Sequence, residues 1–329
     1  MTRPTFRLEG TVDLMKTAEA GERILSEVRK VVIGQDSAQE LVLASILADG
    51  HVLLEGVPGL AKTLLVRVMA KVLGLDFKRV QFTPDLMPSD VLGTNVFDQR
   101  NADFTLKKGP IFTSIMLADE INRTPPKTQA ALLEAMEERQ VTIDGNSMAL
   151  PYPFLVFATQ NPVEFEGTYP LPEAQQDRFL LKVVLGYPQD SEEIQVLQNF
   201  HKGFRSQKLE LADLQAVSSE AELREIREEV KSVTIEDKMF RYIYDIVAGT
   251  RKHPEILVGA SPRAGLALVS CSQAIAALRG RNFVIPDDIK DLALPVLRHR
   301  ILLRPEAEIE GQTVDTVVRG LVETQVVPR

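Results

Sequence analysis

Short apolar runs alternate along this chain with longer stretches in which apolar residues recur at a helical spacing. Five runs are predicted to be strands, at residues 51–55, 77–82, 114–118, 154–159 and 179–185, and the first and fourth of them have the composition of buried strands. Helical stretches separate several of them, notably 63–73 and 127–138, and another precedes the first at 37–47. Strands that alternate with helices predict a parallel five-stranded sheet covered by helices on both faces, and therefore an α/β fold.

Two further segments interrupt this alternation and are predicted to be β-hairpins. Residues 91–108 have the pattern of a short hairpin, and residues 141–150 place Asp144 and Gly145 between two strand-like stretches. After residue 188 the strand pattern ends, and helical patterns continue to the C-terminus.

The chain has 329 residues, which suits a large domain followed by a smaller one. The pattern predicts a helical lead-in over 1–30, an αβα domain over 31–199, a charge-rich connector over 200–232 and an all-helical lid domain over 233–329. Helices are predicted to begin at Ser37, which forms a capping box with Glu40, and at Ser261, which precedes Pro262.

Composition and charge limit the expected partners, redox environment and location of this protein. Apolar residues make up 44% of the chain, and the formal net charge of -8 argues mildly against a protein that wraps DNA. The single cysteine, Cys271, excludes an internal disulfide and is predicted to be a buried thiol. Apolar runs are too short to span a bilayer, and the N-terminus lacks an apolar signal core, so the cytoplasm is the expected location. The four histidines are scattered, and no zinc site is predicted.

The strongest chemical motif follows the first predicted strand. It fits the phosphate-loop pattern and comprises Gly56, Val57, Pro58, Gly59, Leu60, Ala61, Lys62, Thr63 and Leu64. Backbone N–H groups of such a loop, at the start of a helix, face phosphate oxygens. Lys62 is expected to reach the β and γ phosphates of ATP. Ala61 stands where the general pattern has glycine, and we expect it to keep a right-handed backbone.

Two adjacent carboxylates end the third predicted strand, about 60 residues after the loop. Ligands bind at this carboxyl edge in open α/β sheets. Asp119 is expected to hold Mg²⁺ together with the Thr63 hydroxyl, and Glu120 to polarise the attacking water. Neighbouring acids repel each other, so this pair favours a nearby cation over a purely structural role.

Three more polar residues have both a chemical and a plain structural interpretation. Asn161 ends the fourth strand, where it could orient water or simply initiate an Asn-Pro turn. Arg178 precedes the last strand and could equally form a surface ion pair with a nearby acid, Asp177 or Glu173. Arg263 falls in the first turn of a helix, where a cation opposes the helix dipole unless a phosphate is bound nearby.

With these elements in this order, the chain resembles the AAA+ ATPases, and within them the MoxR family of the helix-2-insert branch. The resemblance runs over nearly the whole chain, from Val32 to the last helices. The strings that carry it are GVPGLAKT at 56–63, DEINR at 119–123, ALLEAM at 131–136 and LPEAQQDRF at 171–179. Alanine at position 61 is itself typical of MoxR proteins.

The resemblance implies a nucleotide domain with a helical lid, and assembly of copies into a ring, usually of six subunits. It implies protein clients, often with a partner that carries a von Willebrand factor A domain, and hairpins that face the pore or the upper surface of the ring. It also implies roles for single residues: Val32, Ile33 and Gly34 by the adenine, Asn161 as first sensor, Arg178 as the arginine finger, Arg263 as second sensor, and Arg123 as a further candidate for contact across the subunit interface.

These observations predict an Mg-ATP-hydrolysing ring ATPase that remodels or matures protein clients and does not insert into the membrane. A DNA-acting motor is one alternative, since hairpin-bearing AAA+ relatives include helicases. The acidic balance and the absence of lysine and arginine from 144–147 weigh against a nucleic-acid partner. A scaffold that binds ATP and hydrolyses it too slowly to matter is a second alternative.

Overall fold

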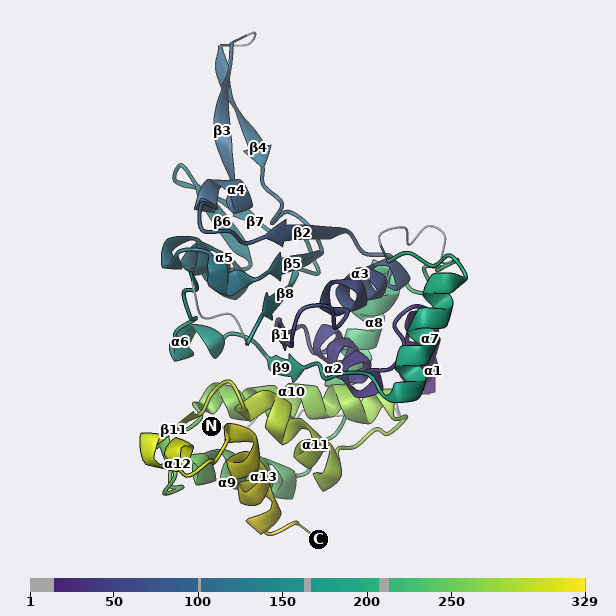
Figure 1. Cartoon of the computed structure of the whole chain (residues 1–329), viewed down its shortest axis with the longest axis vertical. Helices are drawn as coiled ribbons and strands as arrows, with labels where there is room; N and C mark the ends of the chain where they lie inside the picture. Colours follow the sequence, from purple (N-terminus) through teal and green to yellow (C-terminus); the bar gives the residue numbers. More distant parts are fainter. Residues whose placement is uncertain (1–14, 100–101, 163–166, 207–212, 329) are drawn as a thin grey trace, which may run out of the picture.

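The computed structural model describes residues 15–99, 102–162, 167–206 and 213–328. At its centre is a parallel five-stranded sheet with the strand order β2-β5-β8-β1-β9 (Figure 1). The strands are β1 Val52–Glu55, β2 Phe77–Gln81, β5 Ile115–Asp119, β8 Leu155–Gln160 and β9 Leu181–Val184. They nearly coincide with the five predicted runs, so the α/β prediction is confirmed.

Different helices cover the two faces of this sheet, because successive residues of a strand point to opposite sides. Leu54 packs into a core cluster with residues of α2 (Asp36–Leu47) and α3 (Lys62–Val72). Its neighbour Leu53 packs into a second cluster with residues of α5 (Pro126–Glu138). The three central strands, β5, β8 and β1, are buried on both sides and therefore hold their carboxyl-terminal edge in a fixed position.

Shorter and flanking helices complete this part of the chain. They are α1 Met15–Arg29, α4 Pro88–Leu92, the 3-10 helix η1 Ile121–Arg123, α6 Glu173–Gln176, α7 Asp190–His201 and α8 Glu220–Lys231. The predicted capping box at Ser37 is wrong: α2 begins at Asp36, and the residue before it, Gln35, has a left-handed backbone with φ 61°. Ser37 thus already lies inside the first turn.

Both predicted hairpins are present. β3 (Gly93–Asp98) pairs with β4 (Asp103–Lys108), and β6 (Gln140–Ile143) pairs with β7 (Asn146–Ala149). The β3–β4 hairpin projects far from the sheet (Figure 1). It carries two aromatic rings in an edge-to-face contact, Phe97 and Phe104, with centroids 5.3 Å apart and 50% and 67% of their surfaces exposed.

The C-terminal part of the chain is a helical lid. Its helices are α9 Asp237–Thr250, α10 Pro262–Leu278, α11 Pro286–Leu297, α12 Pro305–Ile309 and α13 Val314–Thr324. A short antiparallel ribbon of β10 (Ile256–Val258) and β11 (Leu302–Leu303) is added to them, so the expectation that the lid is all-helical is wrong in this detail. Both segments are too brief to show a strand pattern in the sequence.

Two smaller predictions for the lid are confirmed. Ser261 caps α10, because its hydroxyl accepts a hydrogen bond from the backbone N–H of Arg263 at 3.1 Å. Cys271 is fully buried in α10, and burial raises the pKa of its thiol to about 12. None of the helices in the described ranges is long and apolar enough to cross a membrane.

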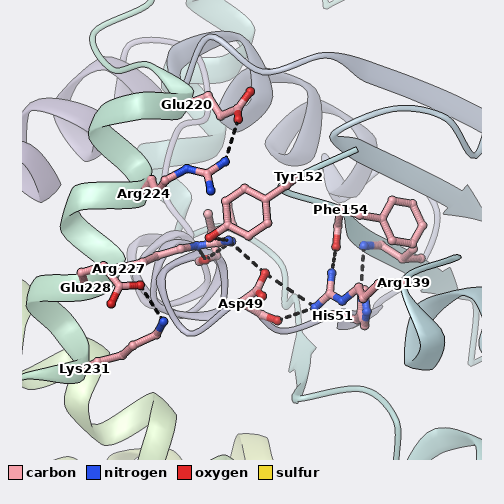
Figure 2. A network of polar contacts seen from close by, with 12 residues as sticks. Asp49, His51, Arg139, Tyr152, Phe154, Glu220, Arg224, Arg227, Glu228 and Lys231 are labelled. Carbon is pink, nitrogen blue, oxygen red and sulfur yellow. Dashed lines mark hydrogen bonds and ion pairs between the residues drawn. The ribbon is translucent and has the colours of Figure 1, made fainter. Parts of the chain in front are cut away.

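A network of polar contacts ties α8 to the amino-terminal edge of the sheet (Figure 2). Arg227 of α8 is 1% exposed, and its guanidinium lies 2.9 Å from Asp49 Oδ1 and donates twice to the Ile46 carbonyl. Arg139, directly after α5, donates to the Asp49 carbonyl at 2.8 Å and to the Phe154 carbonyl. The contacts fix the end of α5 against the start of β1.

His51 lies next to this network and is buried in its neutral form. Its Nδ1 accepts a hydrogen bond from the Val156 N–H at 2.9 Å, so the proton is on Nε2, which lies 3.2 Å from the Met136 carbonyl. Burial, followed by the charge of Arg139, lowers the pKa of His51 from 6.5 to about 3. Protonation of Nδ1 would break the bond to Val156.

We predict that this histidine makes the protein less stable in acid. Its pKa is lower in the folded than in the unfolded chain, so the unfolded chain binds the proton first and stability falls as the pH drops below about 6.5. Burial also lowers the pKa of His299, so this second histidine adds its own loss of stability in acid. Between about pH 7.5 and about pH 5, urea unfolding should therefore show a loss that is about 2 kcal/mol smaller in His51→Gln than in the wild type. Replacement of the exposed His201 by glutamine should leave the loss intact. An unchanged pH slope in His51→Gln would contradict this account.

Candidate functional site

The phosphate loop connects the end of β1 to the start of α3, at the carboxyl edge of the sheet. Gly59 has φ 91°, a conformation that suits glycine, while a Cβ on Gly56 would lie 2.9 Å from the Leu185 carbonyl oxygen. Ala61 has φ 58° and ψ 18°, so the expectation of a right-handed backbone at this position is wrong. The tight turn into α3 requires a left-handed residue here, which is why the general pattern has glycine.

We predict that Ala61→Gly makes the protein more stable by about 0.5–1 kcal/mol. Relief of the left-handed alanine, about 1–2 kcal/mol, exceeds the extra freedom that glycine adds to the unfolded chain. The matched control is Ala131→Gly in the middle of α5, which should lower stability by about 1 kcal/mol. Urea unfolding of the three proteins measures both changes, and a loss of stability in Ala61→Gly would contradict the argument.

The side chain of Lys62 spans the ends of two strands. Its Nζ contacts the Gly56 carbonyl and lies 3.4 Å from the carbonyl oxygen of Gln160, the last residue of β8. Asn161 follows immediately and is buried. The structure thus brings Lys62 and Asn161 to the same edge of the sheet.

Asp119 and Glu120 lie at the end of β5, which is separated from β1 and its loop by β8. Asp119 Oδ2 is 3.4 Å from the Thr63 hydroxyl, and its Oδ1 accepts a hydrogen bond from the Thr159 hydroxyl at 2.5 Å. The Glu120 N–H donates to the same Thr159 hydroxyl at 2.8 Å. The Thr63 and Asp119 oxygens are the kind of ligand that Mg²⁺ prefers, so these residues fit that ion.

The segment that contains Val32, Ile33 and Gly34 lies close to the loop. The Gln35 side chain donates to the Gly186 carbonyl at 2.6 Å, and the Leu185 N–H donates to the carbonyl of Glu55, the last residue of β1, at 2.8 Å. Residues 185 and 186 therefore connect this segment to the start of the phosphate loop.

Arg178 and Arg263 lie at the opposite edge of the sheet. Leu181 of β9 pairs in parallel register with Val52 of β1, so Arg178 precedes the strands while the phosphate loop follows them. The Arg178 Nε lies 3.0 Å from Glu137 Oε2, and Arg263 Nη2 contacts the other oxygen of Glu137. The structure brings the two arginines together and keeps them apart from the loop.

Comparisons with known proteins agree with this geometry. Residues 51–181 match the ATPase family associated with various cellular activities (AAA), and residues 248–321 match the AAA lid domain. The chain is 40% identical to chaperone MoxR1 of Mycobacterium tuberculosis, over 94% of this chain and 82% of that protein. It is 31% identical to protein MoxR of Methylorubrum extorquens, over 97% and 98%.

The chain belongs to the MoxR family of AAA ATPases. It is also 49% identical to YeaC of Bacillus subtilis, described as uncharacterized, over 93% of this chain and 94% of YeaC. A crystal structure of a protein assigned as an ATPase from Cytophaga hutchinsonii superimposes with a TM-score of 0.88 at 42% identity. It covers 96% of this chain and 97% of that protein.

Sequence reasoning missed two residues of this MoxR ATPase that contact the paired acids. Arg79 of β2 lies 2.7 Å from Asp119 Oδ2, and Gln81 of β2 donates to Glu120 Oε2 at 2.6 Å. Arg123 also lies 3.3 Å from Glu120. The sequence did contain a signal for Arg79 and Gln81. They are two residues apart in a predicted strand, so their side chains face the same side of the sheet.

Arg178 does form an ion pair, as its plain structural interpretation allowed, but with another partner than Asp177 or Glu173. Asp177 instead accepts hydrogen bonds from two lid residues, Ser261 at 2.8 Å and Arg300 at 2.7 Å. The partner of Arg178 is Glu137, which sequence reasoning did not single out. It is one acid among several in α5, and only the fold distinguishes it.

Proposed function

We propose that this MoxR-family chain is an Mg-ATP-driven ATPase that works as a ring of copies, six in number, and remodels or matures protein clients. Each copy supplies the phosphate loop and the two acids from one edge of its sheet. The neighbouring copy supplies Arg178 and Arg263 from the opposite edge of its own.

The loop side of the site suits phosphate binding and activation of water. Backbone N–H groups at the start of α3, together with Lys62, hold the phosphates, and Thr63 and Asp119 hold Mg²⁺. When bound, the ion neutralises charge on the phosphates. Glu120 takes the proton of the attacking water, and Asn161 orients that water. Val32, Ile33 and Gly34 border the adenine.

The observation that carries the proposal is the position of the two arginines. Arg178 precedes β9 while Gly56 follows β1, and these strands run parallel side by side. An arginine at that edge cannot reach the phosphates of its own chain. It can complete the site of a second copy, as an arginine supplied in trans does in related nucleotide hydrolases.

Protein clients are supported by the β3–β4 hairpin and by one relative. The hairpin extends away from the body of the molecule and exposes the Phe97–Phe104 pair, an apolar contact surface for polypeptide (Figure 1). A relative at 40% identity is named a chaperone. We further propose a cytoplasmic location and a partner with a von Willebrand factor A domain.

A concentration series tests the proposal. Turnover per subunit should rise steeply over the range in which sedimentation shows the ring forming, and should then level off. Constant low turnover across that range would favour a nucleotide-gated scaffold. Tight DNA binding that weakens steeply with salt would instead favour a DNA-acting motor.

A further inference from the structure

One carboxylate contacts both arginines that the proposed function places in a neighbouring copy's site. Glu137, in the last turn of α5, lies 3.0 Å from Arg178 Nε through Oε2 and accepts from Arg263 Nη2 through Oε1. Arg178 belongs to the sheet domain, whereas Arg263 is in the first turn of α10 in the lid. Glu137 therefore joins two arginines that are distant in sequence.

The geometry leaves both guanidinium groups able to bind something else. Among the described residues, Arg178 is paired through Nε, so its two terminal nitrogens remain for a further acceptor. Arg263 is held at one terminal nitrogen and keeps its other N–H groups. A carboxylate placed in this way orients the two cations while it leaves donors for a phosphate.

The charges around Glu137 also favour an anion. The three residues border a cavity of about 330 Å³. Among its other charged residues, Arg300 lies 2.7 Å from Asp177, and Asp49 lies 3.6 Å from Arg139 and 2.9 Å from Arg227 of α8. The guanidinium groups of Arg178 and Arg263 then share the single negative charge of Glu137. One positive charge is left over at this cavity.

Separate contacts hold a residue near Glu137 and the residue next to Arg178 in place. Arg139, two residues further on, is bound to the Asp49 and Phe154 carbonyls (Figure 2). On the lid side, Asp177 is bound to Ser261 and Arg300. The side-chain geometry of the arginine pair then depends on Glu137 itself.

We propose that Glu137 is a positioning residue that sets Arg178 and Arg263 as a pair for the nucleotide of the adjacent copy, an inference that rests on the proposed function. Without its charge, the two guanidinium groups repel and lose their common partner. Arg263 of the lid and Arg178 of the sheet domain then no longer bind the phosphate together.

The test begins with Glu137→Gln in the full-length chain. We expect kcat for ATP to fall about 10- to 100-fold, because small displacements of catalytic groups cost that much. The dissociation constant for MgATP and the melting temperature should stay unchanged, since Glu137 is a half-exposed surface residue that does not contact its own phosphate loop. The neighbouring exposed Glu138→Gln should behave as the wild type. Wild-type kcat in Glu137→Gln would overturn the proposal.

Mixed rings then decide in which copy Glu137 acts. Arg178→Ala subunits keep the loop side intact, and Glu120→Gln subunits keep the arginine side intact, so mixing them should restore turnover. Glu137→Gln should likewise be rescued by Glu120→Gln and not by Arg178→Ala. Rescue by Arg178→Ala would overturn the role of Glu137 while leaving the proposed function standing. Failure of the Arg178→Ala and Glu120→Gln mixture would overturn the action in trans itself.

Discussion

Glu120→Gln is expected to bind MgATP as tightly as the wild type and to hydrolyse it about 10²–10⁴-fold more slowly. Glutamine keeps the size of the side chain and can still bond to Gln81, which contacts Glu120 at 2.6 Å. It cannot take a proton from the attacking water. The loss corresponds to about 3–5 kcal/mol of barrier.

Phosphate release at saturating ATP measures the loss, and titration with a fluorescent ATP analogue measures binding. Glu138→Gln, an exposed acid on α5, serves as the matched control for the change of charge. Near-wild-type turnover in Glu120→Gln would remove Glu120 from the role of base. If the assignment is correct, the variant should also hold ATP and its client long enough for the client to be captured in a pull-down.

Arg178→Ala is expected to reduce turnover about 10³–10⁵-fold, the contribution of an arginine supplied in trans in related nucleotide hydrolases. Each subunit should still bind MgATP, because Arg178 lies at the edge of the sheet opposite the phosphate loop. The defect should therefore appear in kcat and leave the dissociation constant unchanged.

Arg241→Ala provides the control, because Arg241 is an exposed arginine of α9 that pairs with Asp245 in the lid. It should leave turnover unchanged. If Arg178→Ala hydrolysed ATP at the wild-type rate in assembled rings, Arg178 could not be the finger. If it lost MgATP binding instead, the residue would act within its own subunit.

Much of the fold was predictable from local patterns. The three central strands, β1, β5 and β8, are largely apolar runs of core length, and a strand buried on both faces leaves that pattern whatever its neighbours are. Asp144 and Gly145 predicted the β6–β7 hairpin because turn residues act over a few positions. The short β10–β11 ribbon in the lid was not predicted, because segments of two or three residues are too short to show the alternating pattern of a strand.

The candidate site likewise has residues that the sequence predicted and features that it did not predict. Lys62, Thr63, Asp119 and Glu120 were predictable because a loop after a strand and acids at the end of another strand must meet at one edge of a parallel sheet. The backbone of Ala61 was not, since residue type alone favoured the right-handed conformation. Only the turn into α3 imposes φ 58°.

The sequence by itself predicted which residues gather at the carboxyl edge of the sheet of this MoxR ATPase, because Asp119 and Asn161 lie at strand ends and Lys62 ends the loop that follows a strand. The tertiary structure decided which residues that are distant in sequence lie together in space. Glu137 and Arg263 are separated by 126 positions, and they meet because the lid packs against the end of α5. Such contacts depend on how helices and strands pack against one another, and the spacing of residues along the chain does not reveal that packing.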